Sequence, residues 1–228
     1  FIKAFDVPVT TFTEASFSAW VNFESVTGTF QYVMGMGNNT ISFMSISKFQ
    51  SSGPFYTFDG TGTKQCAISP VANRWYHVAV TQTGTVRRFY IDGVEDANSP
   101  FTCNALAIPY DNLTIGAYNY SSPSSPPASP LYRLDGQLSN VQVWDIVLEL
   151  SDVEDLYNNG QPLMTGTQPE QANLRAWYKL NQTANWEADS ALNWQIPDAV
   201  SAYPQSFDFD GVNNLITLNK PSSWDDNQ

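Results

Sequence analysis

Residues 16–23 alternate between polar and apolar side chains with a period of two. Phe17, Ala19, Val21 and Phe23 fall on one side of an extended chain. This alternation is typical of a β-strand that packs one face on a hydrophobic core. The segment therefore predicts one strand of a layered β-protein.

Further short segments have the composition of strands, and turn residues separate them. Residues 75–81 are apolar on both sides, as expected of a central strand. Asp92-Gly93 predicts a tight hairpin turn. The other expected strands are 32–36, 41–46, 55–58, 87–91, 113–116, 138–144, 174–180 and one within 207–218. Many short strands of this kind predict an all-β fold, a two-sheet antiparallel jelly-roll sandwich.

One short helix is expected near 151–159. Ser151 is placed to cap it, Glu154 would complete a capping box, and Gly160 would end it. The rest of the composition favours sheets, because aromatic residues make up 14% of the chain and charged residues only 14%.

The charge of the chain argues against some partners. Its 10 Lys and Arg residues stand against 22 Asp and Glu residues, which gives a formal net charge of −12. Such a surface repels the phosphate groups of nucleic acids and of anionic membranes. No apolar run approaches the roughly 20 residues that span a bilayer. We therefore expect neither nucleic-acid binding nor membrane insertion.

Cysteines and sequons both favour an oxidising compartment. We expect a disulfide between Cys66 and Cys103 across neighbouring strands, with two buried free thiols as the alternative. N-glycosylation is predicted at Asn38, Asn112, Asn119 and Asn181. These features predict an extracellular glycoprotein at a cell surface or on a virion. Because Phe1 is not a natural start, we expect the sequence to be a piece of a longer protein.

Four stretches carry a family resemblance. They are Phe17-Ser18-Ala19-Trp20-Val21, the pair Trp75-Tyr76-His77-Val78-Ala79-Val80 and Phe89-Tyr90-Ile91-Asp92-Gly93, Leu113-Thr114-Ile115-Gly116, and residues 134–144. In this order they resemble the laminin-G-like branch of the concanavalin A-like lectin and pentraxin superfamily, over most of residues 12–160. The resemblance implies the sandwich fold. It leaves the function open, because this fold hosts lectins, adhesion modules, hydrolases and spacers.

The resemblance also bears on the boundaries of the module. Modules of this family usually open with a strand that reads Phe-Asp-Gly, and here that pattern lies at the back, within 207–217. Phe1-Ile2-Lys3 matches Leu215-Ile216-Thr217, which gives a repeat length of 215 − 1 = 214 residues. We expect a sandwich module over 1–205. Residues 206–228 would then hold a strand that completes this sandwich or a neighbour's, or opens the next tandem repeat. The candidate assembly-strand residues are Phe207, Phe209, Val212, Leu215 and Ile216.

Catalysis is not expected. Hydrolases of this fold need two carboxylates about 5 Å apart on one strand, and no Glu-x-Asp-x-x-Glu pattern is present. His77 is the only histidine and is interpreted as structural, which leaves no zinc triad and no Ser-His-Asp arrangement. We therefore assign no catalytic residue.

Binding sites are predicted at two groups of loops. Family members often hold calcium between two turns, and the matching turns here offer Asn39 and Asn119. Asn stands where Asp is common, and neutral ligands weaken a calcium site. Tyr118, Asn119, Tyr120 and Tyr132 would form a sugar-binding patch, because aromatic faces beside polar groups suit a pyranose. The alternative is that these aromatic residues cover the edge of the core.

We expect a non-enzymatic structural or adhesion module of an extracellular fibre, a cell surface or a virion. It would assemble head to tail with copies of itself or with neighbouring repeats. The alternative function is that of a lectin module that binds glycans, with Ca²⁺ as the one candidate cofactor.

Overall fold

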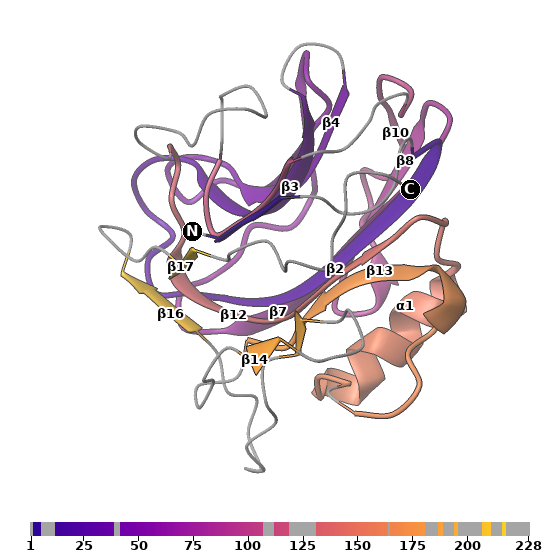
Figure 1. Cartoon of the computed structure of the whole chain (residues 1–228). Helices are drawn as coiled ribbons and strands as arrows, with labels where there is room; N and C mark the ends of the chain where they lie inside the picture. The colour runs from indigo at the N-terminus through magenta and orange to yellow at the C-terminus, as the bar shows by residue number, and fades with distance from the viewer. Residues whose placement is uncertain are drawn as a thin grey trace.

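The computed structural model describes residues 2–5, 12–38, 42–106, 112–118, 131–163, 165–180, 187–188, 194–195, 207–210 and 216–217. Two β-sheets pack face to face, and a short helix lies on the outer side of one of them (Figure 1). The expected all-β, two-sheet sandwich with one short helix is therefore confirmed.

The seven-stranded sheet carries the β3–β4 hairpin near its centre. In order across the sheet its strands are β17 (Ile216–Thr217), β1 (Ile2–Phe5), β11 (Asn112–Ile115), β3 (Gln31–Asn38), β4 (Ser42–Lys48), β5 (Phe55–Phe58) and β6 (Thr63–Gln65). Neighbouring strands are antiparallel except at one edge, where β17 lies parallel to β1.

The eight-stranded sheet forms the other layer. In order its strands are β10 (Phe101–Thr102), β8 (Val86–Ile91), β7 (Trp75–Thr83), β2 (Glu14–Phe23), β12 (Asp135–Trp144) and β13 (Leu174–Tyr178), with β9 (Val94–Glu95) paired to β8 and β16 (Phe207–Asp210) to β12. β7 lies between β8 and β2, which confirms its central position. A separate two-stranded sheet joins β14 (Glu187–Ala188) and β15 (Trp194–Gln195).

The hydrophobic core lies between the two large sheets, where the period-two patterns place it. Phe17, Ala19, Val21 and Phe23 are all 0% exposed and belong to one buried cluster. From the seven-stranded sheet, alternate residues meet them, including Met34, Met36, Met44, Ile46 and Phe55. Burial of each large apolar side chain contributes roughly 1.5–3 kcal/mol, so the alternation fixes which face of each strand turns inward.

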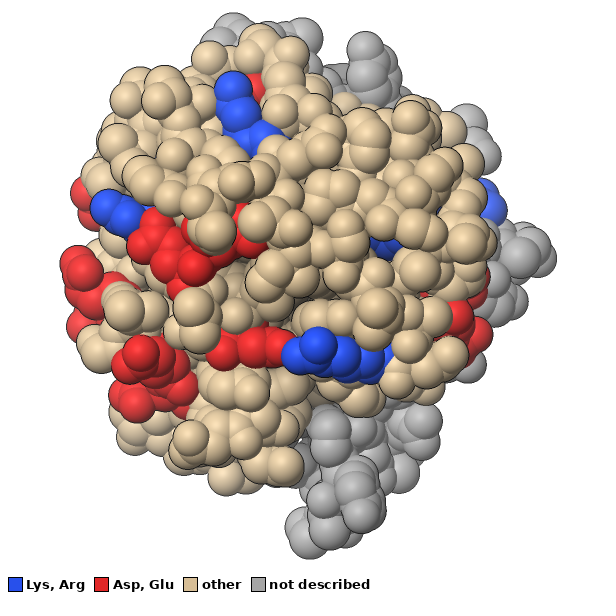
Figure 2. Space-filling model, turned by 180° about the vertical axis from the view of Figure 1, so that it is seen from behind, with Lys and Arg blue, Asp and Glu red and all other residues tan. Residues whose placement is uncertain are grey.

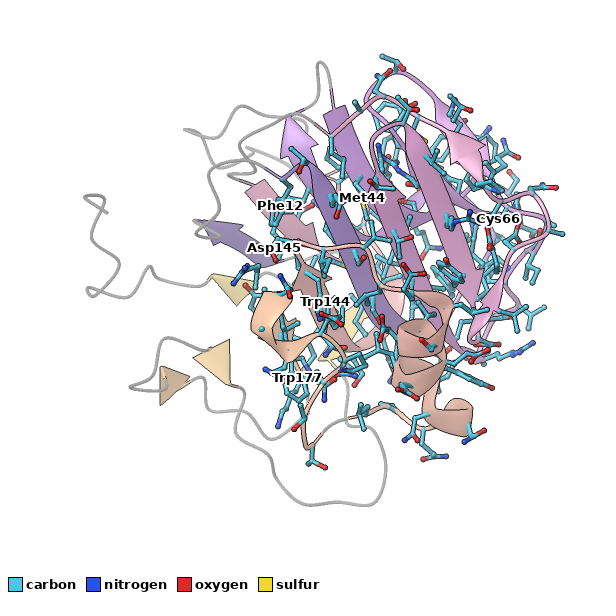
Figure 3. All side chains as sticks on the ribbon, turned by 90° about the vertical axis from the view of Figure 1, so that its right-hand side faces the viewer. Phe12, Met44, Cys66, Trp144, Asp145 and Trp177 are labelled. Carbon is cyan, nitrogen blue, oxygen red and sulfur yellow. The ribbon has the colours of Figure 1, made fainter. Side chains whose placement is uncertain are left out.

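Helix α1 (Leu150–Tyr157) covers part of the outer face of the eight-stranded sheet (Figure 3). Val153 and Leu156 pack there with Trp144 in a second buried cluster. Two 3-10 helices follow the helix, η1 (Asn158–Gly160) and η2 (Gln171–Asn173).

The predicted helix cap was wrong by two residues. The N-cap is Glu149, and its backbone N–H donates to Oδ2 of Asp152 at 2.9 Å, so Ser151 and Glu154 do not form the N-terminal cap. The reason lies just before the helix, where Leu148 is fully buried and its N–H donates to Oγ of Ser16. This contact of Leu148 determines where the chain turns into the helix.

One buried arginine ties the two sheets together. Arg87, on β8, is 0% exposed and points into the sandwich. Its guanidinium donates to Oε1 of Gln82 at 2.6 Å on its own sheet. Across the sandwich it donates to Oγ1 of Thr57 at 2.7 Å and to the carbonyl oxygens of Phe58 and Phe43, each at 2.8 Å. Because an unpaired buried charge is very costly, the three bonds across the sandwich hold the sheets in one register.

The side of the sandwich at β6 and β10 is closed by polar contacts. Both carboxylate oxygens of Asp96 accept from the N–H of Ala67, at 2.8 and 3.0 Å. The side-chain amide of Asn98 donates to the carbonyl of Gln65 at 3.2 Å. Asp96 and Asn98 follow β9 of the eight-stranded sheet, whereas Gln65 ends β6 of the seven-stranded sheet. These contacts join the two layers.

The predicted disulfide is not formed, and both thiols are free and buried. Cys66 follows β6, and its N–H pairs with the carbonyl of Phe55. Cys103 follows β10 and pairs in the same way with Thr85. The two residues therefore belong to different sheets rather than to neighbouring strands of one ladder. Burial raises the pKa of both thiols, which keeps them protonated.

The tail contributes one strand to each large sheet. β16 runs antiparallel to the first half of β12, with Phe207 opposite Leu138. β17 runs parallel to β1, with Ile216 beside Ile2 and Thr217 beside Lys3. Val212 and Leu215 of the predicted assembly strand lie outside the described residues. The pairing within one chain leaves the predicted division at residue 205 untested.

Replacing Arg87 by Gln should lower the free energy of unfolding by about 3–5 kcal/mol, because the carbonyls of Phe43 and Phe58 would lose their charged donor. Arg87→Lys should recover little, since an ammonium group cannot reproduce the planar fork. Urea denaturation measures both changes.

The matched control is the next residue along the chain. Arg88 is largely exposed and pairs with Glu95 at 2.7 Å. Arg88→Gln should change the stability by no more than about 1 kcal/mol. Equal effects of the Arg87 and Arg88 substitutions would show that Arg87 does not tie the sheets together.

Candidate functional site

The outer face of the seven-stranded sheet is aromatic. Its strands carry rings at the positions that alternate with core residues, and loop residues add others. We call this set the outer aromatic face: Phe30, Tyr32, Phe43, Phe49, Tyr56, Phe58, Tyr118 and Tyr132. An antiparallel sheet commonly turns a polar face to water. An aromatic outer face therefore indicates either a binding function or a segment of chain that covers it.

Tyr32 lies at the centre of this face. Its ring centroid is 4.7 Å from that of Tyr118, 5.9 Å from that of Tyr56 and 6.1 Å from that of Tyr132. The rings of Tyr32 and Tyr132 are stacked, with an interplanar angle of 18°. Aromatic pairs at such distances attract one another beyond the burial of their area, so the rings hold one another in place.

A glycine makes room for one of these rings. A Cβ atom on Gly35 would lie 2.7 Å from Cζ of Phe43, far inside van der Waals contact. The ring of Phe43 therefore lies directly over the backbone of β3. Any side chain at position 35 would displace it.

Hydroxyl groups lie among the rings. The phenol of Tyr32 is hydrogen-bonded to the hydroxyls of Tyr56 and Ser47. Burial raises the pKa of both phenols well above the usual range. Both therefore stay protonated at any ordinary pH, and the face is neutral and able to form hydrogen bonds.

Tyr132 brings the aromatic surface out to solvent. It is 38% exposed, next to Leu131 at 46%, whereas Tyr32, Tyr56 and Tyr118 are buried. Its ring is stacked with that of Tyr32 at an interplanar angle of 18° and lies edge to face with that of Phe30. Its backbone has a φ of 51°, in the left-handed region that bulky residues avoid. The hydrogen bond from the N–H of Tyr32 to the carbonyl of Tyr132, at 3.0 Å, helps to hold that conformation.

Two of the four predicted sugar-binding residues come together. The ring centroids of Tyr118 and Tyr132 lie 5.9 Å apart. Tyr118 is only 6% exposed, so it supports the patch from below. Asn119 and Tyr120 lie outside the described residues. Sequence reasoning missed Phe30, Tyr32, Phe49 and Tyr56, although their place outside the inward set of each strand was a usable signal.

The calcium prediction is not tested, since Asn39 and Asn119 lie outside the described residues. The pairing of β11 with β3 nevertheless indicates how far apart the two turns lie. The N–H of Gly116 donates to the carbonyl of Val33, whereas Asn38 is the last residue of β3. Val33 and Asn38 are five residues apart along an extended strand, or roughly 17 Å, which is unfavourable for one ion shared by both turns. Among the described residues, no group of three or more His, Cys, Asp or Glu side chains is arranged to hold a metal.

The glycosylation predictions also remain predictions. Asn119 and Asn181 lie outside the described residues, and of Asn38 and Asn112 the structure describes the strand position only.

No helix among the described residues is long and apolar enough to cross a bilayer. Figure 2 shows acidic side chains gathered toward one side of the face in view, with a broad area free of charge.

His77 lies far from the aromatic face, on the outer side of the eight-stranded sheet. It is 1% exposed, and its Nε2 lies 2.8 Å from Oγ of Ser18. Its backbone N–H donates to Oδ1 of Asp92 at 2.9 Å. The imidazole is thus buried in a packed layer, as the structural interpretation of this residue expects.

Comparison with known proteins extends these observations. A family model described as the concanavalin A-like lectin/glucanases superfamily matches residues 2–154. A proposed carbohydrate-binding protein from Bacteroides ovatus is 17% identical with a TM-score of 0.61, and the match covers 82% of this chain and 50% of that one. The heptameric SAP-like pentraxin from Limulus polyphemus is 16% identical with a TM-score of 0.53, over 68% of this chain and 74% of the pentraxin. No curated protein matches the chain by sequence.

These likenesses show a shared fold, and they confirm the resemblance that the sequence motifs indicated. The chain spans half the length of the Bacteroides protein.

The burial of His77 predicts a pH-dependent stability. Burial lowers its pKa from 6.5 to about 3. As the pH falls below 6.5, the unfolded chain binds a proton that the folded chain does not, so stability falls by about 1.4 kcal/mol per unit. Above pH 6.5 the residue contributes no pH dependence. Between pH 6.5 and 5 the stability advantage of the wild type over His77→Gln should therefore shrink by about 2 kcal/mol. Urea denaturation at several pH values measures this, and a constant difference would contradict it.

Proposed function

The chain belongs to the concanavalin A-like lectin/glucanases superfamily, and from this we propose that it is a non-enzymatic module that recognises glycans through its outer aromatic face. The observation that carries the proposal is Tyr132, which is 38% exposed and whose ring stacks with the buried ring of Tyr32. The module would act outside the cell, on a cell or virion surface.

The chemistry of the face suits a sugar. The apolar face of a pyranose stacks on a flat aromatic ring, and its hydroxyl groups need donors and acceptors beside that ring. Phe30 lies next to Tyr132, with ring centroids 5.2 Å apart, and widens the apolar surface. A neutral face favours neutral glycans over charged ones. A rigid ring also binds with little loss of conformational entropy.

Two carboxylates beside β9 are held in hydrogen bonds that leave them no part in hydrolysis. The carboxylate of Asp96 is held by backbone N–H groups, and that of Asp92 by the N–H of His77 and by Arg74. Both therefore have structural roles. Incubation with a panel of polysaccharides should release no reducing sugar, and measurable turnover would contradict the non-enzymatic part of the proposal.

Tyr132→Ala should weaken binding to any glycan found on an array by about 5- to 30-fold, since stacking on one aromatic ring is worth about 1–2 kcal/mol. Leu150→Ala is the matched control, because Leu150 is exposed to a similar degree, at 46%, on the opposite layer. It should leave affinity unchanged. Equal affinity of both variants, with unaltered melting temperatures, would exclude Tyr132 from the site.

Calcium dependence is a separate part of the proposal. If Asn39 or Asn119 helps to hold an ion near the face, a chelator should reduce glycan binding and added calcium should restore it. Binding that resists the chelator would leave the aromatic face as the site and remove calcium from it.

Assembly is the second candidate function, and the edge of the seven-stranded sheet favours it. β17 lies beside β1 with Ile216 level with Ile2, an offset of 216 − 2 = 214 residues. This equals the repeat length expected from the sequence, so the tail lies next to the strand that it resembles. A strand of that kind could serve a second copy or the next repeat equally well. The module would then build a fibre or a surface array head to tail.

Cross-linking separates the two pairings. Chains carrying Lys3→Cys and chains carrying Thr217→Cys, mixed and oxidised, should form disulfide-linked dimers if the tail pairs with another copy. The double variant tests pairing within one chain, and the wild type controls for Cys66 and Cys103. Cross-links only in the double variant would contradict assembly through this strand.

A further inference from the structure

Three buried polar atoms belong to neighbouring residues on the outer face of the eight-stranded sheet. They are Nε1 of Trp20, Nδ1 of His77 and Oδ1 of Asn22, and none has a hydrogen-bond partner among the residues that the structure describes. Trp20 and His77 face each other across β2 and β7. Asn22 is two residues further along β2, on the same face. The three side chains are therefore neighbours on this face, and the place between them borders all three.

Other groups around this place already have contacts with one another. Nε2 of His77 lies 2.8 Å from Oγ of Ser18. Tyr157, the last residue of α1, stacks on Trp20 with ring centroids 5.9 Å apart and lies 6.2 Å from the imidazole. These rings close the place off, and Trp20 is only 4% exposed.

Three unpaired polar atoms are too costly to leave unsatisfied. Each buried donor or acceptor without a partner costs about 1–3 kcal/mol. Three of them would remove a large part of the roughly 5–15 kcal/mol that stabilises a domain. The arrangement therefore indicates a bound group that the chain itself does not supply.

The three atoms define what that group is. The indole of Trp20 only donates, the amide oxygen of Asn22 only accepts, and Nδ1 of His77 does one or the other according to its tautomer. The indole N–H disfavours a cation and the amide oxygen disfavours an anion. A neutral hydroxyl both donates and accepts, so it satisfies all three atoms in either tautomer.

We propose that one water molecule is bound here as an integral part of the fold, with hydrogen bonds to Trp20, His77 and Asn22. Three bonds are the usual number for a buried water. The water joins β2 to β7 beneath Tyr157, where the chain leaves α1. This site is independent of the outer aromatic face on the other layer.

Nuclear magnetic resonance of the labelled full chain tests the proposal. The indole proton of Trp20 should show a nuclear Overhauser effect to water with the sign of a long-lived bound molecule. The indole of Trp144 is the internal control, because it is equally buried but donates to the carbonyl of Pro169 at 3.0 Å. It should show no such effect.

Two variants make the result decisive. Ser18→Ala removes a hydroxyl that could relay magnetisation from water, and the Trp20 signal should survive it. His77→Phe removes one of the three partners, and the signal should fall severalfold. If His77→Phe does not fold, a crystal structure of the wild type replaces it and should show a water within hydrogen-bond distance of all three atoms. A Trp20 indole that behaves like that of Trp144, or no water at that place in the crystal, would overturn the proposal.

Discussion

The guanidinium of Arg87 is the interaction on which the rest of the sandwich depends. It lies between the sheets without exposure and reaches Thr57, Phe58 and Phe43 on the opposite layer. Two of these partners are carbonyl groups of residues whose rings face outward. A cation inside the core thereby fixes the backbone that carries the aromatic surface outside it. Burial of such a charge is tolerated only because every direction of the fork finds an acceptor.

The outer faces of the two sheets differ, and this difference bears on where the proposed binding site lies. The eight-stranded sheet carries Ser18, Trp20 and His77 outward, and helix α1 with its following loop covers much of that face. The seven-stranded sheet carries rings outward, and they pack on one another up to the exposed Tyr132. One face is thus covered by the helix, whereas the other is an aromatic surface with a solvent-exposed residue, Tyr132. The proposed recognition site lies on the second.

Much of this was predictable from the sequence, because period two is a strong signal in long strands. The alternation at 16–23 predicted the inward-facing residues of β2 correctly, and the apolar run at 75–81 predicted the central position of β7. Strands of two or three residues such as β6, β9 and β10 have no such period and were missed. The helix was foreseen, but its cap depends on a tertiary contact of Leu148 that local sequence does not contain. The role of Arg87 was equally hidden, because the sequence contains two adjacent arginines and does not show which of them is buried. Tyr118 and Tyr132 were foreseen as neighbours, whereas Tyr32, at the centre of the face, was assigned only to a strand.

Arg87 thus positions the outer aromatic face from within the core. The aromatic chemical shifts of folded Arg87→Gln, compared with those of the wild type, test this role. We expect clear shift changes for the rings of Phe43, Phe58 and Tyr118, and little change for Trp144 under the helix on the other layer. Unchanged shifts at Phe43 and Phe58 in the folded variant would contradict it.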